Sequence, residues 1–150
     1  MPTKAIEFGK LVNLCVKISP GCANCYASSL THRFGGPDYL QRSLECFEPV
    51  LVEKELKAIL NSKATGVKVF AFDMTDAFLY FLPDEFLDKF FAVAALRPDL
   101  TFQILTKRAE RMYRYFSNPD LEDRLTELSQ GDDPDRQTWN VLLPLPNVVL

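Results

Sequence analysis

The amino-acid sequence predicts an α/β fold in which parallel strands alternate with helices. Three observations support this class. Short apolar segments rich in β-branched and aromatic residues recur along the chain, segments with helical apolar spacing follow them, and proline or glycine separates the two kinds. Strands joined through helices pair in parallel, with right-handed crossovers. The chain has 150 residues, so we expect a single domain over residues 1–150.

The amino-terminal part begins with LVNLCV, residues 11–16, a short apolar segment suited to a first strand. The Ser, Pro and Gly of the following KISPGCANC predict a loop. Residues 23–34 fit a first helix, which the next residues, Gly-Gly-Pro, would end. Pro49 opens a second helical segment, VEKELKAILNS, whose leucine and isoleucine residues lie near one face.

The middle of the chain carries the strongest periodic signals. VKVFAFD, residues 67–73, is typical of a buried second strand. Pro83, followed by two acidic residues, predicts the first turn of a helix that Pro98 stops. The apolar residues of this helix recur at intervals of three and four, and we expect them in the core: Phe86, Leu87, Phe90, Phe91 and Ala94.

The last third predicts one more strand–helix unit and the start of another strand. TFQILT, residues 101–106, is the third strand, and KRAERMYRYFS is the helix after it. Residues 117–140 are polar and predict a surface excursion with a short helix near 121–128, and the final NVVL resembles a fourth strand. We therefore expect a partial parallel-stranded (βα) barrel that is incomplete at its C-terminus.

Composition narrows the class of protein. A formal net charge of −3 excludes a polyanion-binding protein that works through its overall charge, although a local basic site remains compatible with it. No apolar segment is long enough to span a bilayer, and the start, MPTKAIEFGK, lacks the layout of a secretory signal. We expect a cytoplasmic protein with no membrane partner.

Three of the four cysteines follow the first predicted strand in the pattern Cys15-x6-Cys22-x2-Cys25. Active sites of parallel α/β barrels lie at this end of the strands. Thiolates are the usual ligands of iron–sulphur clusters, and three cysteines without a fourth nearby could leave one iron of a 4Fe-4S cluster open to a substrate or cofactor. Cys15, Cys22 and Cys25 are thus candidate cluster ligands.

Two alternatives remain open from the spacing alone. The same three cysteines together with His32 or Cys46 would provide the four ligands of a structural zinc site. The cysteines could also be unligated, and Cys46 on its own is best interpreted as a small buried hydrophobic residue.

The segment CVKISPGCANCYA resembles the three-Cys motif of a phage- and prophage-associated protein family of no settled function that is related to the radical SAM superfamily. VFAFDMTDAF, LPDEFLDKFFAVAALRPDLTFQILTKRAERM and LPLPNVVL resemble further blocks of that family, so the similarity covers roughly 100 residues. The entry, IEF, departs from the family in lacking its tryptophan. The first cysteine gap is wider than the CxxxCxxC of typical radical SAM proteins, a width that is usual for this family.

The resemblance implies a radical-SAM-type barrel with a 4Fe-4S cluster and S-adenosylmethionine (SAM) as cofactors. In such proteins the reduced cluster passes an electron to the sulphonium of SAM, whose homolysis gives a 5′-deoxyadenosyl radical. A reductant protein would be a partner, and the phage association suggests a substrate related to nucleic acid. A non-catalytic metal-binding module and a truncated, inactive remnant of the enzyme are the competing functions.

Residues after the second and third predicted strands would approach the cofactor. By analogy with radical SAM proteins, Asp73 and Asp76 would lie near the methionine end of SAM, and turn formation or helix capping is their structural alternative. Lys107 and Arg108 could bind the SAM carboxylate or a substrate phosphate, or simply begin a solvated helix. Tyr26 could pack beside the cluster or an adenine ring, or be structural.

Overall fold

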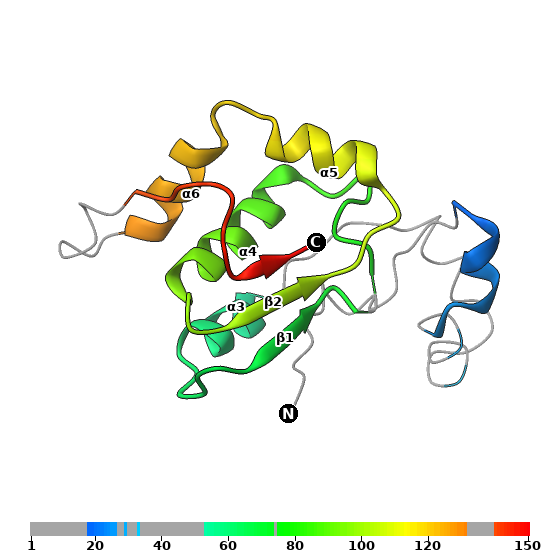
Figure 1. The fold of residues 1–150 in the computed structure, drawn as a ribbon, viewed down its shortest axis with the longest axis horizontal. Helices are drawn as coiled ribbons and strands as arrows, with labels where there is room; N and C mark the ends of the chain where they lie inside the picture. Colours follow the sequence, from blue (N-terminus) through cyan, green and yellow to red (C-terminus); the bar gives the residue numbers. More distant parts are fainter. Residues whose placement is uncertain (1–17, 27–28, 30–32, 34–52, 74, 132–139) are drawn as a thin grey trace.

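The computed structural model describes residues 18–26, 29, 33, 53–73, 75–131 and 140–150 (Figure 1). The predicted strand at 11–16 and most of the helix at 23–34 lie outside these residues, as do Cys15, His32 and Cys46. The elements in chain order are η1 (Pro20–Asn24, a 3-10 helix), α3 (Glu53–Leu60), β1 (Lys68–Ala71), α4 (Asp84–Leu96), β2 (Thr101–Ile104), α5 (Ala109–Phe116), α6 (Leu121–Gln130) and β3 (Val148–Val149).

The strands form one three-stranded parallel sheet in the order β1-β2-β3. Val69 is the partner of Phe102 in the first pairing, and Phe102 is also the partner of Val148 in the second. The α/β class, the parallel pairing and the strand at NVVL are thereby confirmed. The described residues form this small sheet with its helices and no barrel.

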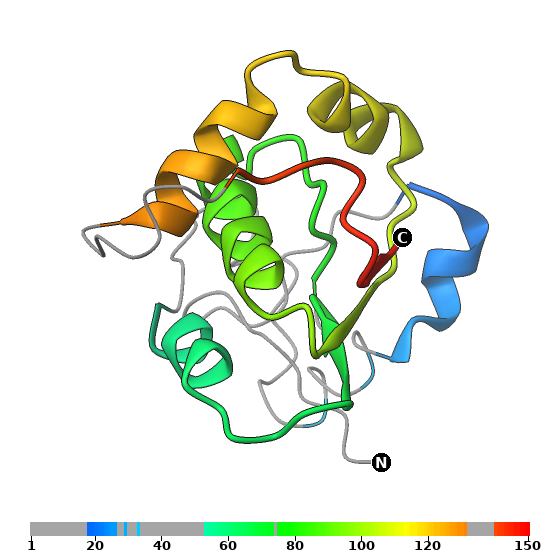
Figure 2. The ribbon, with the colours of Figure 1, turned by 60° about the vertical axis from the view of Figure 1, so that its left-hand side comes forward.

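Helix α4 packs on the sheet and forms the centre of the core (Figures 1 and 2). The ring of Phe90 makes edge contacts with Phe72 at a centroid distance of 5.0 Å and with Phe102 of β2 at 5.5 Å. Phe90 and Phe91 are fully buried, and Phe86 is partly buried against the same core. This burial confirms the expectation that these residues form an apolar stripe of α4 in the core. Large aromatic side chains such as these contribute much of the area that is buried on folding.

The start of α4 and the surroundings of α6 differ from the sequence-based expectation. Pro83 is the N-cap residue of α4, with a ψ of 143°, so the helix begins one residue later than predicted. The description of residues 117–140 as a surface excursion is wrong for α6, whose buried Leu121 and Leu125 belong to the core shared with α4. The apolar positions of α6 repeat at a helical spacing, but its many charged residues mask that pattern.

Asn147 ties the start of β3 to the turn between α4 and β2. Its side-chain amide donates to the carbonyl oxygens of Ala94, Arg97 and Leu100 at 2.9, 3.0 and 3.2 Å. Its own carbonyl accepts a hydrogen bond of 2.8 Å from the backbone N–H of Phe102 in β2. One side chain thus adds hydrogen bonds to three carbonyls of this turn, of which those of Ala94 and Arg97 also accept from backbone N–H groups.

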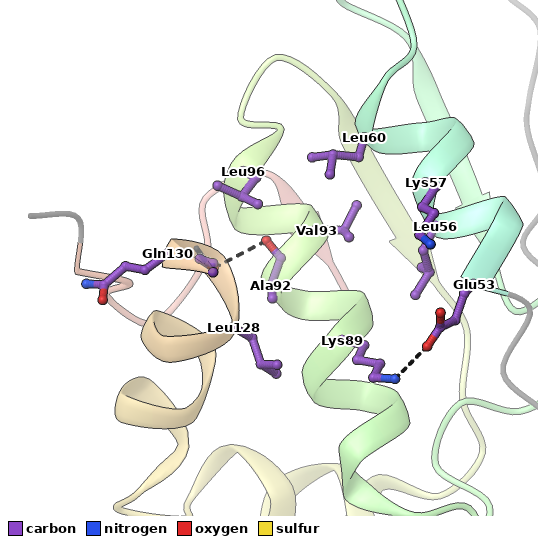
Figure 3. A pocket seen from close by; sticks show the side chains of 12 residues that line it. Glu53, Leu56, Lys57, Leu60, Lys89, Ala92, Val93, Leu96, Leu128 and Gln130 are labelled. Carbon is purple, nitrogen blue, oxygen red and sulfur yellow. Dashed lines mark hydrogen bonds and ion pairs between the residues drawn. The ribbon is translucent and has the colours of Figure 1, made fainter. Parts of the chain in front are cut away.

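An apolar groove of about 330 Å³ runs along α4 between α3 and α6 (Figure 3). Leu56, Val93 and Leu128 contribute to its lining, and an exposed ion pair of 2.7 Å between Lys89 and Glu53 lies at its edge. The loops that follow the strands contribute nothing to this groove. Among the residues that the structure describes, no helix is both long and apolar enough to cross a membrane.

Candidate metal and cofactor site

The candidate residues come together from three segments: η1 and its flanks, the loop after β1 and the loop after β2. In Figure 1 the blue segment that contains η1 lies on the side toward which the arrows of β1 and β2 point, beyond the loops that follow these strands. Two hydrogen bonds confirm this proximity, one from Lys107 to Cys22 and one from Tyr26 to Asp73. Cys22, Tyr26, Asp73 and Lys107 therefore gather at the carboxyl end of the sheet, as expected.

Cys22 and Cys25 stand on one tight turn. Pro20 opens the 3-10 helix η1, and the backbone N–H of Cys25 donates to the carbonyl of Cys22 at 3.4 Å. Cys22 is buried and Cys25 is half-buried, and neither forms a disulfide. Cys15, the third predicted ligand, lies outside the described residues, and within the described ones no group of three metal-ligating side chains occurs.

The hydrogen bonds around Cys22 favour the ionised form of its thiol. Its pKa is lowered to about 6, first by a hydrogen bond from the backbone of Ile18, then by the hydroxyl and backbone of Ser19, and last by Lys107, while burial opposes the shift. The Ser19 hydroxyl lies 3.5 Å from the sulphur. At neutral pH Cys22 is therefore mainly a thiolate, which is the form that ligates metals.

Ser19→Ala is expected to raise the pKa of Cys22 above about 6, because it removes the hydroxyl that lies 3.5 Å from the sulphur and stabilises the thiolate. The measurement is the ultraviolet absorbance of the thiolate against pH in metal-free protein, with Cys22→Ser as the baseline. An unchanged pKa in Ser19→Ala would contradict this role of the hydroxyl.

Lys107 points toward the cysteine turn. Its ammonium nitrogen lies 3.3 Å from the Cys22 sulphur and 3.4 Å from the Ser19 hydroxyl. Its backbone N–H donates to a carboxylate oxygen of Asp76 at 3.1 Å, which fixes the main chain from which the side chain extends. A cation at this distance stabilises the charged form of the sulphur.

Asp76 is a buried acceptor that joins the two loops. One carboxylate oxygen accepts hydrogen bonds from the backbone N–H of Phe78 at 2.9 Å and the hydroxyl of Thr106 at 2.7 Å. The other accepts from the backbone of Lys107 and from the guanidinium of Arg108, at 3.1 and 2.7 Å. The bond to Phe78 confirms the turn-forming alternative for this residue.

The ion pair between Asp76 and Arg108 is almost fully enclosed, with side-chain exposures of 6% and 9%. Both residues therefore position the loops around the cysteine turn, and their direct contact with a cofactor stays a prediction. Tyr26 donates its hydroxyl to the carbonyl oxygen of Asp73 at 2.6 Å, which joins the segment after the cysteines to the loop after β1. Burial, followed by the charge of Asp73, raises the pKa of Tyr26.

Sequence reasoning missed two features of this region. Ser19 contributes to the Cys22 environment, and its place in SPGC, three residues before the cysteine, was the available signal. Arg111 was not singled out from the sequence, but it binds the carbonyls of Leu79 and Leu82 and the carboxylate of Asp84. No local pattern identifies such a role, because its partners lie about 30 residues away in the sequence.

Helix α5 also carries an ordinary surface pair. Arg114 and Glu110, four residues apart on the helix, form an exposed ion pair of 2.9 Å.

Comparisons with known proteins give one match. A family model described as "Protein of unknown function (DUF5131)" matches residues 10–148. No curated protein and no solved structure matches the chain.

Proposed function

The chain belongs to this family of unknown function, and we propose that it is an iron–sulphur protein that uses SAM in radical chemistry, with Cys15, Cys22 and Cys25 as the cluster ligands. The radical-SAM-type barrel is part of the same proposal. The parallel order β1-β2-β3, with helices in each connection, supports it.

The observation that carries the proposal is the position of Cys22, which shares one turn with Cys25 beside the loops that follow β1 and β2 and has the Lys107 ammonium 3.3 Å from its sulphur. Metal binding by a thiol of ordinary pKa has to release a proton, whereas Cys22 with a pKa of about 6 has already lost it at neutral pH. The donor set therefore fits a soft metal or a cluster.

When bound, a 4Fe-4S cluster would supply one electron to SAM, and a reductant protein would return an electron to the cluster. The described residues have separate tasks around it. Lys107 donates to the Cys22 sulphur, and Asp76 with Arg108 holds the loop that carries this lysine. Asp73 lies next to Tyr26 on the same side and is the proposed acceptor for the amino group of SAM.

The decisive measurement is iron and sulphide analysis of anaerobically purified protein, with electron paramagnetic resonance of the reduced form before and after SAM is added. We expect iron and sulphide near cluster stoichiometry and a signal that SAM changes. Cys22→Ala should lose nearly all of the iron, because three cysteines are the minimum for a four-iron cluster with one open iron.

Cys46→Ala is the matched control, and it should retain the iron. Zinc alone in the native protein would instead indicate a structural metal-binding module. A folded native protein without any metal would indicate that the chain is an inactive remnant of the enzyme. Either result refutes the radical SAM proposal.

A further inference from the structure

A cleft of about 580 Å³ opens beside the cysteine turn, and its lining is strongly basic. Ile18, from the segment that leads into η1, forms one wall. Phe78 and Tyr80, from the loop after β1, form a second wall. The third wall comes from the loop after β2 and the first turns of α5, beginning at Lys107, so the cleft shares this lysine with the environment of Cys22.

Four cationic side chains and one acidic side chain line the cleft. The cationic ones are Lys107, Arg108, Arg111 and Arg114, and the acidic one is Glu110. Arg108 and Arg111 are already paired with carboxylates, at 2.7 and 2.9 Å. These two residues shape the wall, and their charge is largely compensated. Arg114 and Lys107 remain for a ligand. Lys107 already donates to the Cys22 sulphur and lies against the Ser19 hydroxyl, so only the third N–H of its ammonium can reach a ligand.

Arg114 is available to an anion. Its ion pair with Glu110 is exposed on both sides, with side-chain exposures of 74% and 88%. Exposed pairs of this kind contribute little free energy, so a phosphate group can replace the carboxylate at small cost. A guanidinium also matches the geometry of a phosphate through two parallel hydrogen bonds.

The cleft also presents an aromatic face. Tyr80 is 73% exposed although its loop is otherwise well buried, and its ring is braced edge-on against Phe81 at a centroid distance of 4.9 Å. An exposed tyrosine held next to cationic side chains is the arrangement with which proteins bind nucleotides, since the ring stacks on a base while the cations hold the phosphate.

We infer that this cleft binds a nucleotide unit, with its phosphate at Arg114 and Lys107 and its base on Tyr80. A free nucleotide and a single-stranded nucleic acid share this chemistry. A local site of this kind is compatible with the net charge of −3, because binding depends on the few cations that reach the ligand. That the nucleotide is the substrate rests on the proposed function, whereas its binding does not require a metal.

The test is fluorescence anisotropy of a labelled oligothymidylate of about ten nucleotides, since single-strand sites commonly cover 4–16 nucleotides, titrated with the full chain at low salt. Arg114→Glu and Tyr80→Ala are each expected to weaken binding about tenfold. Tyr80→Phe retains the ring and should bind like the native protein, which separates stacking from misfolding. Lys57→Glu and Tyr113→Ala are matched controls, because both residues are exposed and neither lines the cleft.

Competition then identifies the source of the nucleotide. Displacement of the labelled strand by thymidine monophosphate at comparable concentration supports a free nucleotide, and displacement by unlabelled strands alone supports nucleic acid. The inference fails if no saturable binding occurs, or if Lys57→Glu weakens binding as much as Arg114→Glu. Cys22→Ala separates the two proposals, because it should lose iron and still bind the strand.

Discussion

Asp76→Asn is expected to lower the free energy of unfolding by about 3–5 kcal/mol, as breaking a buried ion pair on one side does. The four groups around Asp76 are all donors, and the carboxylate accepts from each of them. In asparagine one oxygen becomes an NH₂ group. It would face either the Arg108 guanidinium and the backbone N–H of Lys107, or the donors of Phe78 and Thr106. In the first orientation the NH₂ group opposes two donors. In the second it opposes the N–H of Phe78, while the Thr106 hydroxyl can turn to accept from it. In both, the Arg108 guanidinium faces a neutral amide in place of the carboxylate.

Chemical denaturation of both proteins measures this loss. Asp84→Asn is the matched control, since it removes a carboxylate from a neighbouring arginine, Arg111, at a similar distance of 2.9 Å. The Asp84 side chain is 44% exposed, so water can solvate the amide, and the expected loss is below about 1 kcal/mol. Equal losses in the two variants would show that the enclosure of Asp76 contributes nothing.

Asp88→Ala is expected to have a comparable effect, about 3 kcal/mol or more. This carboxylate is buried within α4 and accepts from the hydroxyl of Tyr115 in α5 at 2.8 Å and from the guanidinium of Arg124 in α6 at 2.9 Å. Burial, and next the hydrogen bond to Asp88, raises the pKa of Tyr115, so the neutral hydroxyl is the form that folding favours. One carboxylate thus connects three helices.

The three residues should not contribute independently. Tyr115→Phe removes one donor and leaves Asp88 paired with Arg124, so its expected loss is smaller, about 1 kcal/mol. Combining Asp88→Ala with Tyr115→Phe should cost less than the sum of the single changes, because the second change removes the hydroxyl that the first leaves unsatisfied. Additive losses in a denaturation series would rule out this coupling.

Much of the fold follows from local sequence patterns. The helix around Phe90 and the strand VKVFAFD have strong periodic or compositional signals, and both occur where expected. NVVL was identified as a strand from four residues, and the sheet forms through Val148 and Val149. The surface interpretation of α6 failed because charged residues mask the helical spacing of Leu121 and Leu125, and because α4, which buries them, lies elsewhere in the chain.

The candidate site was predictable in its location and less so in its contacts. Parallel strands bring the residues after β1 and β2 to one edge, so Asp76 and Lys107 could be placed near the cysteines from order alone. The sequence offers no way to tell that Lys107 faces Cys22 while Arg108 faces Asp76. That division depends on a carboxylate more than 30 residues away, whose hydrogen bonds orient the main chain between the two cations.

The order β1-β2-β3 also affects how the molecule reaches its native state. Each pairing joins strands separated by at least one helix, so no strand pair can form as a local hairpin. Loop closure must precede such pairing, which makes it slow compared with helix formation. Asp76 and Lys107 follow different strands and meet only once β1 and β2 have paired. The full surroundings of Cys22 are therefore completed late in folding, and a metal would meet this side of its site only after the sheet has formed.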